Sequence, residues 1–373
     1  MTRETRAVIS PAALRHNLGV ARRAAPDSRV MAVIKSNGYG HGLLRAARAL
    51  RHADAFGVTC MEEAVPLREA GYAHPILLLE GLFDISELEL ARRYRLDMLV
   101  HSDWQIRMLE TARPGRPLSV WLKVDSGMHR LGFAPGDVAA VYRRLADTPA
   151  VNDNIRFVTH LACADDRDDD RTTARQVDVF SACLQDLPGD RSIANSAGVL
   201  GWPITHADWI RPGVMLYGVD PFIDERSERP PLRPAMTLSS PLIAINHCAA
   251  GDSVGYGATW TCPEDMPVGV VAIGYGDGYP RHAGNGTPVL VNGRETQMVG
   301  RVSMDMITID LRGLFDEVSI GDRVTLWGEG LPVERVAAHA GTIGYELLCG
   351  VTTRVHMEVA RQDNEDGPGT DAV

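Results

Sequence analysis

Eight short apolar segments recur along the first part of this chain, and they constrain its fold more than any other feature. Each resembles a strand in length, and a short continuous apolar run such as residues 31–34 is typical of a strand buried on both faces of a parallel sheet. The eight runs span residues 30–35, 55–60, 75–81, 97–101, 119–125, 155–161, 191–195 and 208–211. Other stretches carry apolar residues at helical spacing and are expected to cover the sheet as helices. These stretches are residues 12–24, 43–51, 61–70, 85–94, 104–112, 137–146 and 172–187.

Eight strand and helix units in roughly 200 residues predict an α/β fold, a closed TIM-type (β/α)8 barrel. A doubly wound open sheet is the alternative, but the first strand lacks the GxGxxG sequence that often opens such a sheet. The alternation stops at residues 220–234, DPFIDERSERPPLRP. Its prolines and charges are typical of a domain junction.

Beyond the junction, apolar and polar residues alternate in short runs separated by Gly, Asp and Asn, which predicts a mostly β C-terminal domain. The runs are residues 236–247, 269–273, 289–291, 306–311 and 323–327, with helical patterns at 333–341 and 343–349. We expect residues 1–10 to form an N-terminal strand that packs on the C-terminal domain. Residues 11–230 would form the cofactor-binding barrel, 231–362 the β-rich domain and 363–373 a disordered tail.

Charge and cysteine content exclude several classes of partner. The chain has 373 residues and a formal net charge of −10. We therefore expect no nucleic acid and no membrane as partner, since nucleic acids and anionic membranes attract clustered Lys and Arg. No apolar run reaches the ~18 residues of a membrane span, and the first residues contain no signal-peptide core, which favours the cytoplasm. The six cysteines lack CxxC or Cys/His spacing, so we expect free thiols and no metal site.

Polar residues follow several predicted strands at the end where a barrel holds its reactive groups. Lys35 ends the first strand, in MAVIKSNGYGHG at 31–42, and a lysine packed against apolar walls suits Schiff-base chemistry. The residues that follow later strands are Lys123, Asp125, Arg130, His160, Asn195, Ser196 and Arg211. Taken singly, each has an ordinary structural interpretation, such as a helix cap for Asn195 and Ser196. Their joint occurrence at strand ends favours a catalytic site.

A phosphate site is predicted across the barrel from Lys35. Pro212 and Gly213 open a short segment whose free N–H groups would face the barrel mouth after the eighth strand. Loops after the seventh and eighth strands often bind phosphate in such barrels. A lysine and a phosphate site together suggest a cofactor with a carbonyl and a phosphate, which pyridoxal phosphate fits.

Eight motifs carry a resemblance to a known family along nearly the full chain. They are AVIKSNGYGHG at 32–42, KVDSGMHRLGF at 123–133, THLACADD at 159–166, NSAGVLGWP at 195–203, RPGVMLYG at 211–218, VGYGATW at 254–260, IGYGDGYPR at 273–281 and VGRVSMDM at 299–306. In this order they resemble the motifs of bacterial, pyridoxal-phosphate-dependent alanine racemases, which have a barrel followed by a β domain.

The resemblance implies a two-base reaction. Family members hold pyridoxal phosphate as an aldimine on the lysine matching Lys35, which moves the substrate Cα proton on one face. The tyrosine matching Tyr256 serves the opposite face and comes from the partner subunit of a homodimer. A chain from Arg211 through His160 would support Tyr256.

The resemblance also assigns binding roles. Arg211 would donate to the pyridine nitrogen and leave the ring a weaker electron sink. Arg130 and the backbone N–H of Met304 would hold the substrate carboxylate. The cofactor, its phosphate above all, would be held by Tyr39, Asn195, Ser196, Gly213 and Val214.

Two details leave questions open within the family. Some relatives carry a carbamylated lysine at the position of Lys123, which would orient Arg130, and its occurrence here is a hypothesis. Where some members have a tyrosine before the final RVP, this chain has Thr352 and Thr353 and then RVH, which leaves substrate size open.

We therefore predict racemisation of L- and D-alanine by a homodimer. D-Alanine would supply cell-wall peptidoglycan or be catabolised. The alternatives are a racemase for another small amino acid such as serine, a non-catalytic pyridoxal-phosphate-binding protein, and a decarboxylase of related fold. The last would need a cysteine near the substrate.

Overall fold

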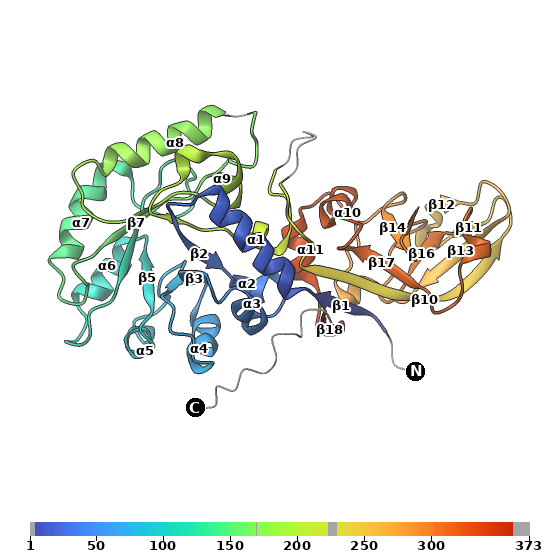
Figure 1. The fold of residues 1–373 in the computed structure, drawn as a ribbon, viewed down its shortest axis with the longest axis horizontal. Coiled ribbons are helices and arrows are strands. Elements are labelled where there is room, and N and C mark those ends of the chain that lie inside the picture. The colour runs from blue at the N-terminus through green and yellow to red at the C-terminus, as the bar shows by residue number, and fades with distance from the viewer. Residues whose placement is uncertain (1–3, 169, 223–229, 361–373) are drawn as a thin grey trace.

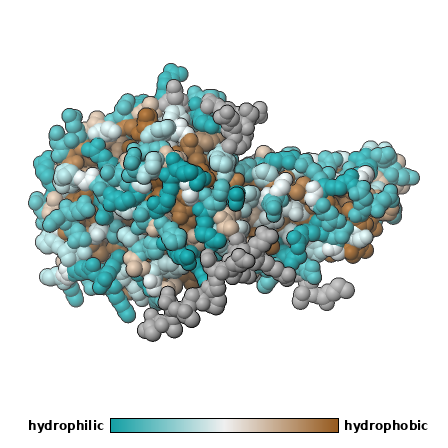
Figure 2. All heavy atoms as spheres, viewed as in Figure 1, coloured by the Kyte–Doolittle hydropathy of each residue, from teal (hydrophilic) through white to brown (hydrophobic). Residues whose placement is uncertain are grey.

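The computed structural model describes residues 4–168, 170–222 and 230–360. These residues form a barrel and a β domain placed end to end (Figure 1). The predicted tail at 363–373 and part of the predicted junction at 220–234 lie outside the described residues. Within those residues no helix is long and apolar enough to cross a bilayer, and the face in Figure 2 is largely hydrophilic with scattered apolar residues.

The barrel is closed, as the apolar runs predicted. Its strands are β2 (Arg29–Val33), β3 (Ala55–Val58), β4 (Ile76–Leu78), β5 (Asp97–Val100), β6 (Val120–Lys123), β7 (Arg156–Val158), β8 (Arg191–Ser192) and β9 (Trp209–Ile210). All neighbours are parallel, and β9 pairs back with β2 through Arg29↔Trp209 and Val30↔Ile210. This closure rules out the doubly wound sheet. Met31, Leu77, Leu99, Trp121 and Trp209 belong to the small apolar cluster formed by barrel-strand residues.

Helices surround the barrel strands (Figure 1). They are α1 (Pro11–Ala24), α3 (Leu43–Ala49), α4 (Met61–Glu69), α5 (Glu87–Arg93), α6 (Asp103–Glu110), α7 (Val138–Ala146), α8 (Asp170–Cys183) and α9 (Ser196–Gly201). α1 begins where Ser10 caps it, because the Ser10 hydroxyl accepts from the Ala13 N–H at 3.1 Å. Single turns complete the barrel at α2 (Lys35–Tyr39), η1 (Pro135–Asp137), η2 (Pro203–Thr205) and η3 (Val214–Tyr217).

The C-terminal domain is mostly β, as predicted. Its strands are β10 (Met236–Cys248), β11 (Ser253–Val254), β12 (Trp260–Thr261), β13 (Met266–Val271), β14 (Pro288–Val291), β15 (Arg294–Gln297), β16 (Ile307–Asp310), β17 (Arg323–Trp327) and β18 (His356–Val359). Its helical elements are η4 (Tyr256–Ala258), η5 (Tyr275–Asp277), η6 (Phe315–Glu317), α10 (Val333–His339) and α11 (Gly344–Gly350). β11, β12, β15 and β18 were not expected, because they are short and lack a clear apolar alternation.

The first strand of the chain, β1 (Arg6–Ile9), belongs to the sheet of the second domain. It pairs antiparallel with β10 through Arg6↔Ser239 and parallel with β18 through Arg6↔His356. One apolar core includes Ile9, Leu14 of α1 and Leu348 of α11. The N-terminal segment therefore ties the two domains together.

Candidate active site

A left-handed turn follows the first barrel strand and carries Lys35. Ser36, Asn37, Gly38 and Tyr39 have φ values of 55°, 54°, 63° and 49°. The left-handed region of φ costs a non-glycine residue about 1 kcal/mol or more. Consecutive left-handed residues therefore persist only when surrounding contacts hold them. Asn37 supplies such contacts, since its side chain accepts from the Leu43 N–H at 2.9 Å and its own N–H donates to Glu63 at 3.2 Å.

A cavity of about 890 Å³ lies at the C-terminal end of the barrel strands. The structure brings most of the sequence-predicted site residues to its wall. These are Lys35, Tyr39, Lys123, Asp125, Arg130, His160, Asn195, Ser196, Arg211, Gly213 and Val214. Lysine and arginine side chains outnumber carboxylates among them, so the cavity suits an anionic molecule.

Arg211 is buried beside β8 and held on several sides. Its Nη1 donates to the Ser192 hydroxyl at 2.6 Å, and its Nη2 donates to the Thr159 carbonyl at 2.6 Å. Burial lowers the pKa of Arg211 to about 10, so the guanidinium keeps its charge at neutral pH. A rigid, permanently protonated donor therefore faces the cavity.

His160 lies next to Arg211 and is neutral. Arg211 Nη2 is 3.4 Å from His160 Nδ1. Burial, followed by the charges of Arg211, Lys123, Arg130 and Lys35, lowers the pKa of His160 well below its usual value. With Arg211 as the donor, Nδ1 accepts and the remaining proton is assigned to Nε2.

A narrow cradle forms where the loop after β9 meets Tyr39. The Ser196 hydroxyl accepts from the N–H groups of Gly213 at 2.9 Å and Met215 at 3.3 Å. A Cβ on Gly213 would lie 2.6 Å from the Tyr39 hydroxyl oxygen, so any larger residue would displace that side chain. Asn195 caps α9 by accepting from the Gly198 N–H at 2.9 Å.

Lys123 and Arg130 form the wall that follows β6. Burial, and then the charges of Arg211 and Arg130, lowers the pKa of Lys123 well below its usual value. Asp125 opposes that shift, and it also accepts from the His129 ring at 3.0 Å. The neutral form of the Lys123 amine is therefore far more accessible than that of a surface lysine.

The second domain adds cavity residues that sequence reasoning did not assign. Tyr345 and Cys349 of α11 line the cavity, and the Tyr345 ring lies 6.2 Å from that of Tyr39. Cys60 and Glu63 also line it, from the loop after β3 and from α4. The only available signal was the helical pattern at 343–349, which indicates a helix but not which face meets the barrel.

Tyr256 and Met304 do not reach this cavity in the same chain. Tyr256 is 70% exposed and lines a separate hollow of about 480 Å³ with Arg301 and Ser303. Met304 is 53% exposed. Thr352, where some relatives have tyrosine, donates to the Gly276 carbonyl at 3.0 Å. Two of the predicted groups therefore lie on an exposed face of the β domain.

The fold and the cavity define a class: barrel enzymes with a second β domain, whose reactive groups stand at the C-terminal strand ends. Comparison with known proteins agrees with that class. Residues 9–221 match the model of the alanine racemase N-terminal domain, and residues 235–359 match that of the C-terminal domain. The chain belongs to the alanine racemase family, a family of isomerases.

Relatives match over nearly the whole chain. The alanine racemase of Halorhodospira halophila is 56% identical over 96% of this chain and 98% of its own length. The alanine racemase of Shewanella sediminis is 53% identical over 94% of this chain and 97% of its own length. The crystal structure of the biosynthetic alanine racemase from Pseudomonas aeruginosa superposes with a TM-score of 0.93 at 46% identity, covering 96% of this chain and 100% of that one.

Proposed function

We propose that this protein interconverts L- and D-alanine with pyridoxal phosphate, and that the D-alanine supplies peptidoglycan or is catabolised. The observation that carries the proposal is the single cavity that Lys35, Arg211 and the Ser196 and Gly213 cradle line together. Its relatives carry the name alanine racemase at 50–56% identity. A cytoplasmic location fits the free cysteines among the described residues.

The residues present fit the cofactor. Tyr39, Asn195, Ser196, Gly213 and Val214 would hold it on the phosphate side, where a Cβ on Gly213 would fill the cradle. Lys35 would bind its aldehyde carbon, and Arg211 would donate to its ring nitrogen. When bound, pyridoxal phosphate supplies an electron sink for the bonds at the substrate Cα.

Two groups of the protein would move the Cα proton. Lys35 acts on one face, and Tyr256 of the partner subunit acts on the other. Arg211 and neutral His160 form a hydrogen-bonded pair in the cavity wall that would orient the phenol of that tyrosine. Arg130 would hold the substrate carboxylate together with the backbone N–H of the partner's Met304, a residue that is exposed in the single chain.

Lys123 carries a further part of the proposal. Its lowered pKa favours the neutral amine, which is the form that attacks CO₂ and loses a proton to give a carbamate. That anion would neutralise part of the Arg130 and Arg211 charge and orient Arg130. Electron density that ends at a plain ammonium would contradict this step.

Chiral chromatography of purified protein incubated with L-alanine tests the activity. We expect D-alanine to accumulate, and the variant Tyr256→Phe to lose most turnover while keeping the pyridoxal absorption band. The phenol is the proton donor and phenylalanine has none. Near-normal turnover in the variant would contradict the two-base reaction.

The same assay with other substrates separates the alternatives. Preferential racemisation of L-serine would indicate the other substrate class, and CO₂ release would indicate a decarboxylase. Retained absorption with no turnover on any amino acid would indicate a non-catalytic binding protein. The match of residues 235–359 to the racemase C-terminal domain favours the first proposal over these.

A further inference from the structure

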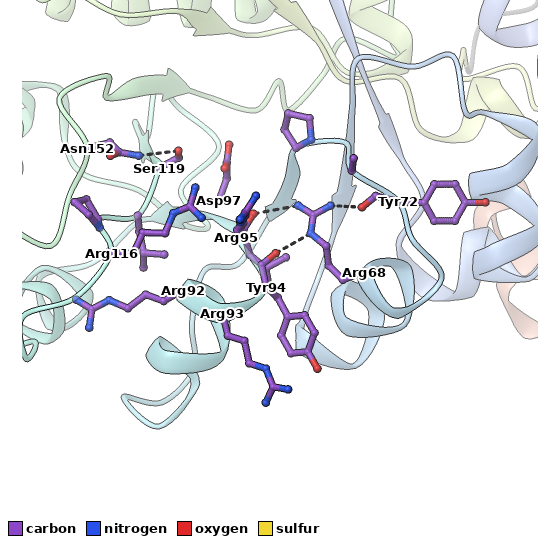
Figure 3. A pocket seen from close by; sticks show the side chains of 15 residues that line it. Arg68, Tyr72, Arg92, Arg93, Tyr94, Arg95, Asp97, Arg116, Ser119 and Asn152 are labelled. Carbon is purple, nitrogen blue, oxygen red and sulfur yellow. Dashed lines mark hydrogen bonds between the residues drawn. The ribbon is translucent and has the colours of Figure 1, made fainter. Parts of the chain in front are cut away.

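A second pocket lies at the N-terminal end of the barrel strands, opposite the active site. Its volume is about 500 Å³, and Figure 3 shows the side chains that line it. The wall comes from the last turns of α4 and α5 and from the segments that lead into β4, β5 and β6. Five of the lining residues are arginines, namely Arg68, Arg92, Arg93, Arg95 and Arg116.

The positive charge of this arginine pocket is largely unneutralised. Arg68 donates only to backbone carbonyls, those of Tyr94 at 2.7 Å, Tyr72 at 2.6 Å, His74 at 2.7 Å and Arg95 at 3.0 Å. Among the described residues no carboxylate lies within 4.0 Å of the Arg93, Arg95 or Arg116 guanidinium. The local excess stands out in a chain whose net charge is −10.

The one carboxylate in the pocket wall is already engaged. Asp97 accepts from Arg156 at 3.3 Å and from the Trp121 indole at 3.3 Å. Both donors come from the barrel strands, where Asp97 begins β5 and is mostly buried. Asp97 therefore offsets part of the charge of Arg156 and, more weakly, part of that of Arg68. The remaining arginines of the pocket wall keep a positive surplus.

Arg92 adds an unsatisfied donor to the wall. It is 6% exposed, and its Nη1 donates to Glu89 at 2.7 Å and to the Arg113 carbonyl at 3.0 Å. No described atom accepts from its Nε or Nη2. A buried donor without a partner destabilises the fold, and more so when it is charged. These two nitrogens are not exposed to solvent, so an anion in the pocket would be attracted by the charge of Arg92 but would contact them only after the side chain moves.

We propose that this pocket binds a small molecule with two or more phosphate groups. Planar guanidinium groups bind phosphate oxygens in pairs, and several arginines around one hollow favour a polyanion over a single charge. Tyr72, Pro75 and Pro117 supply an apolar part of the wall for the remainder of such a ligand. The site is distinct from the catalytic cavity, because the two lie at opposite ends of the strands.

Isothermal titration of the cofactor-loaded protein with inorganic pyrophosphate tests this proposal, at an ionic strength held constant with sodium chloride. We expect saturable binding at one site per chain. The double variant R95E/R116E should bind at least tenfold more weakly, because two attractive contacts become repulsive. Both residues are exposed and lie outside the catalytic cavity, so racemase turnover should not change.

The matched control is R23E/R143E, which makes the same change in net charge. Arg23 and Arg143 are exposed in the last turns of α1 and α7, at the same end of the barrel but outside the pocket. We expect the affinity of this control variant for pyrophosphate to stay within twofold of that of the wild type. If circular dichroism shows R95E/R116E to be unfolded, the variant R116Q takes its place. We expect R116Q to bind pyrophosphate severalfold more weakly than the wild type. Absence of saturable binding to the wild type, or equal losses in pocket and control variants, would overturn the proposal.

Discussion

At the scale of single residues, the site depends on conformations that residue type alone does not indicate. In the Lys35 loop the non-glycine residues Ser36, Asn37 and Tyr39 adopt left-handed φ values, as the glycines beside them do. The neighbouring His41 is fully buried and donates from Nδ1 to the Tyr39 carbonyl at 2.8 Å. This neutral ring helps to hold the turn that carries Lys35.

His41 makes the stability of the fold depend on pH. Burial lowers its pKa from 6.5 to about 4. Its contribution is therefore complete above pH 6.5 and is lost as the pH falls toward 4, because the unfolded chain binds the proton first. We expect a loss of about 2 kcal/mol in the free energy of unfolding between pH 7 and pH 4.5 from this group.

Urea unfolding at the two pH values measures this effect. The variant His41→Phe keeps an aromatic ring beside Tyr217 but cannot titrate. It should be less stable at pH 7, where it lacks the hydrogen bond, and should show a smaller difference between the two pH values. An unchanged pH dependence in the variant would rule out His41 as the cause.

At the scale of elements, the active site depends on the contact between the turn α2 and the helix α11. Gly40 ends α2 with φ at 80°, and a Cβ there would lie 2.1 Å from the Leu348 carbonyl oxygen of α11. α11 also carries Tyr345 and Cys349 into the cavity. The two domains therefore meet through a backbone contact that only glycine permits.

The variant Gly40→Ala should be destabilised by more than about 2 kcal/mol, because it combines an unfavourable φ with a backbone clash. Gly71→Ala is the matched control, since Gly71 has a similar φ of 86° but no atom within 4 Å of the added Cβ. We expect the control to lose about 1 kcal/mol from the φ alone. Denaturant unfolding measures both, and equal losses would show that the α2 and α11 contact is unimportant.

At the scale of the whole molecule, the groups assigned to the reaction lie in two places. Lys35, Arg130 and Arg211 face the barrel cavity, whereas Tyr256 and Met304 are exposed on the β domain. A homodimer in which each β domain covers the other barrel would complete two equivalent sites. This arrangement is part of the proposed function and can be tested without a structure of the dimer.

Mixing two inactive variants provides that test. Lys35→Ala and Tyr256→Phe should each lose nearly all activity. After subunit exchange, half of the dimers would be mixed, and each mixed dimer would contain one intact site, so about a quarter of wild-type activity should return. Mixed dimers that form but stay inactive would mean that Lys35 and Tyr256 act within one chain.

The sequence by itself determined the fold class, the order of the domains and eleven of the residues that line the cavity. Apolar runs, helical spacing and the position of a residue at a strand end are local properties, and near neighbours in the chain decide them. Lys35, His160 and Arg211 were therefore found at the mouth of the barrel as expected.

Only the tertiary structure decided the features that join distant segments. β1 lies between β10 and β18 because Arg6 pairs with Ser239 and His356. α11 closes one side of the cavity, and arginines from three successive strand and helix units form a pocket at the other end of the barrel. These arrangements depend on contacts between residues far apart in the chain. A local sequence pattern does not predict such contacts, because it contains no information about their energies.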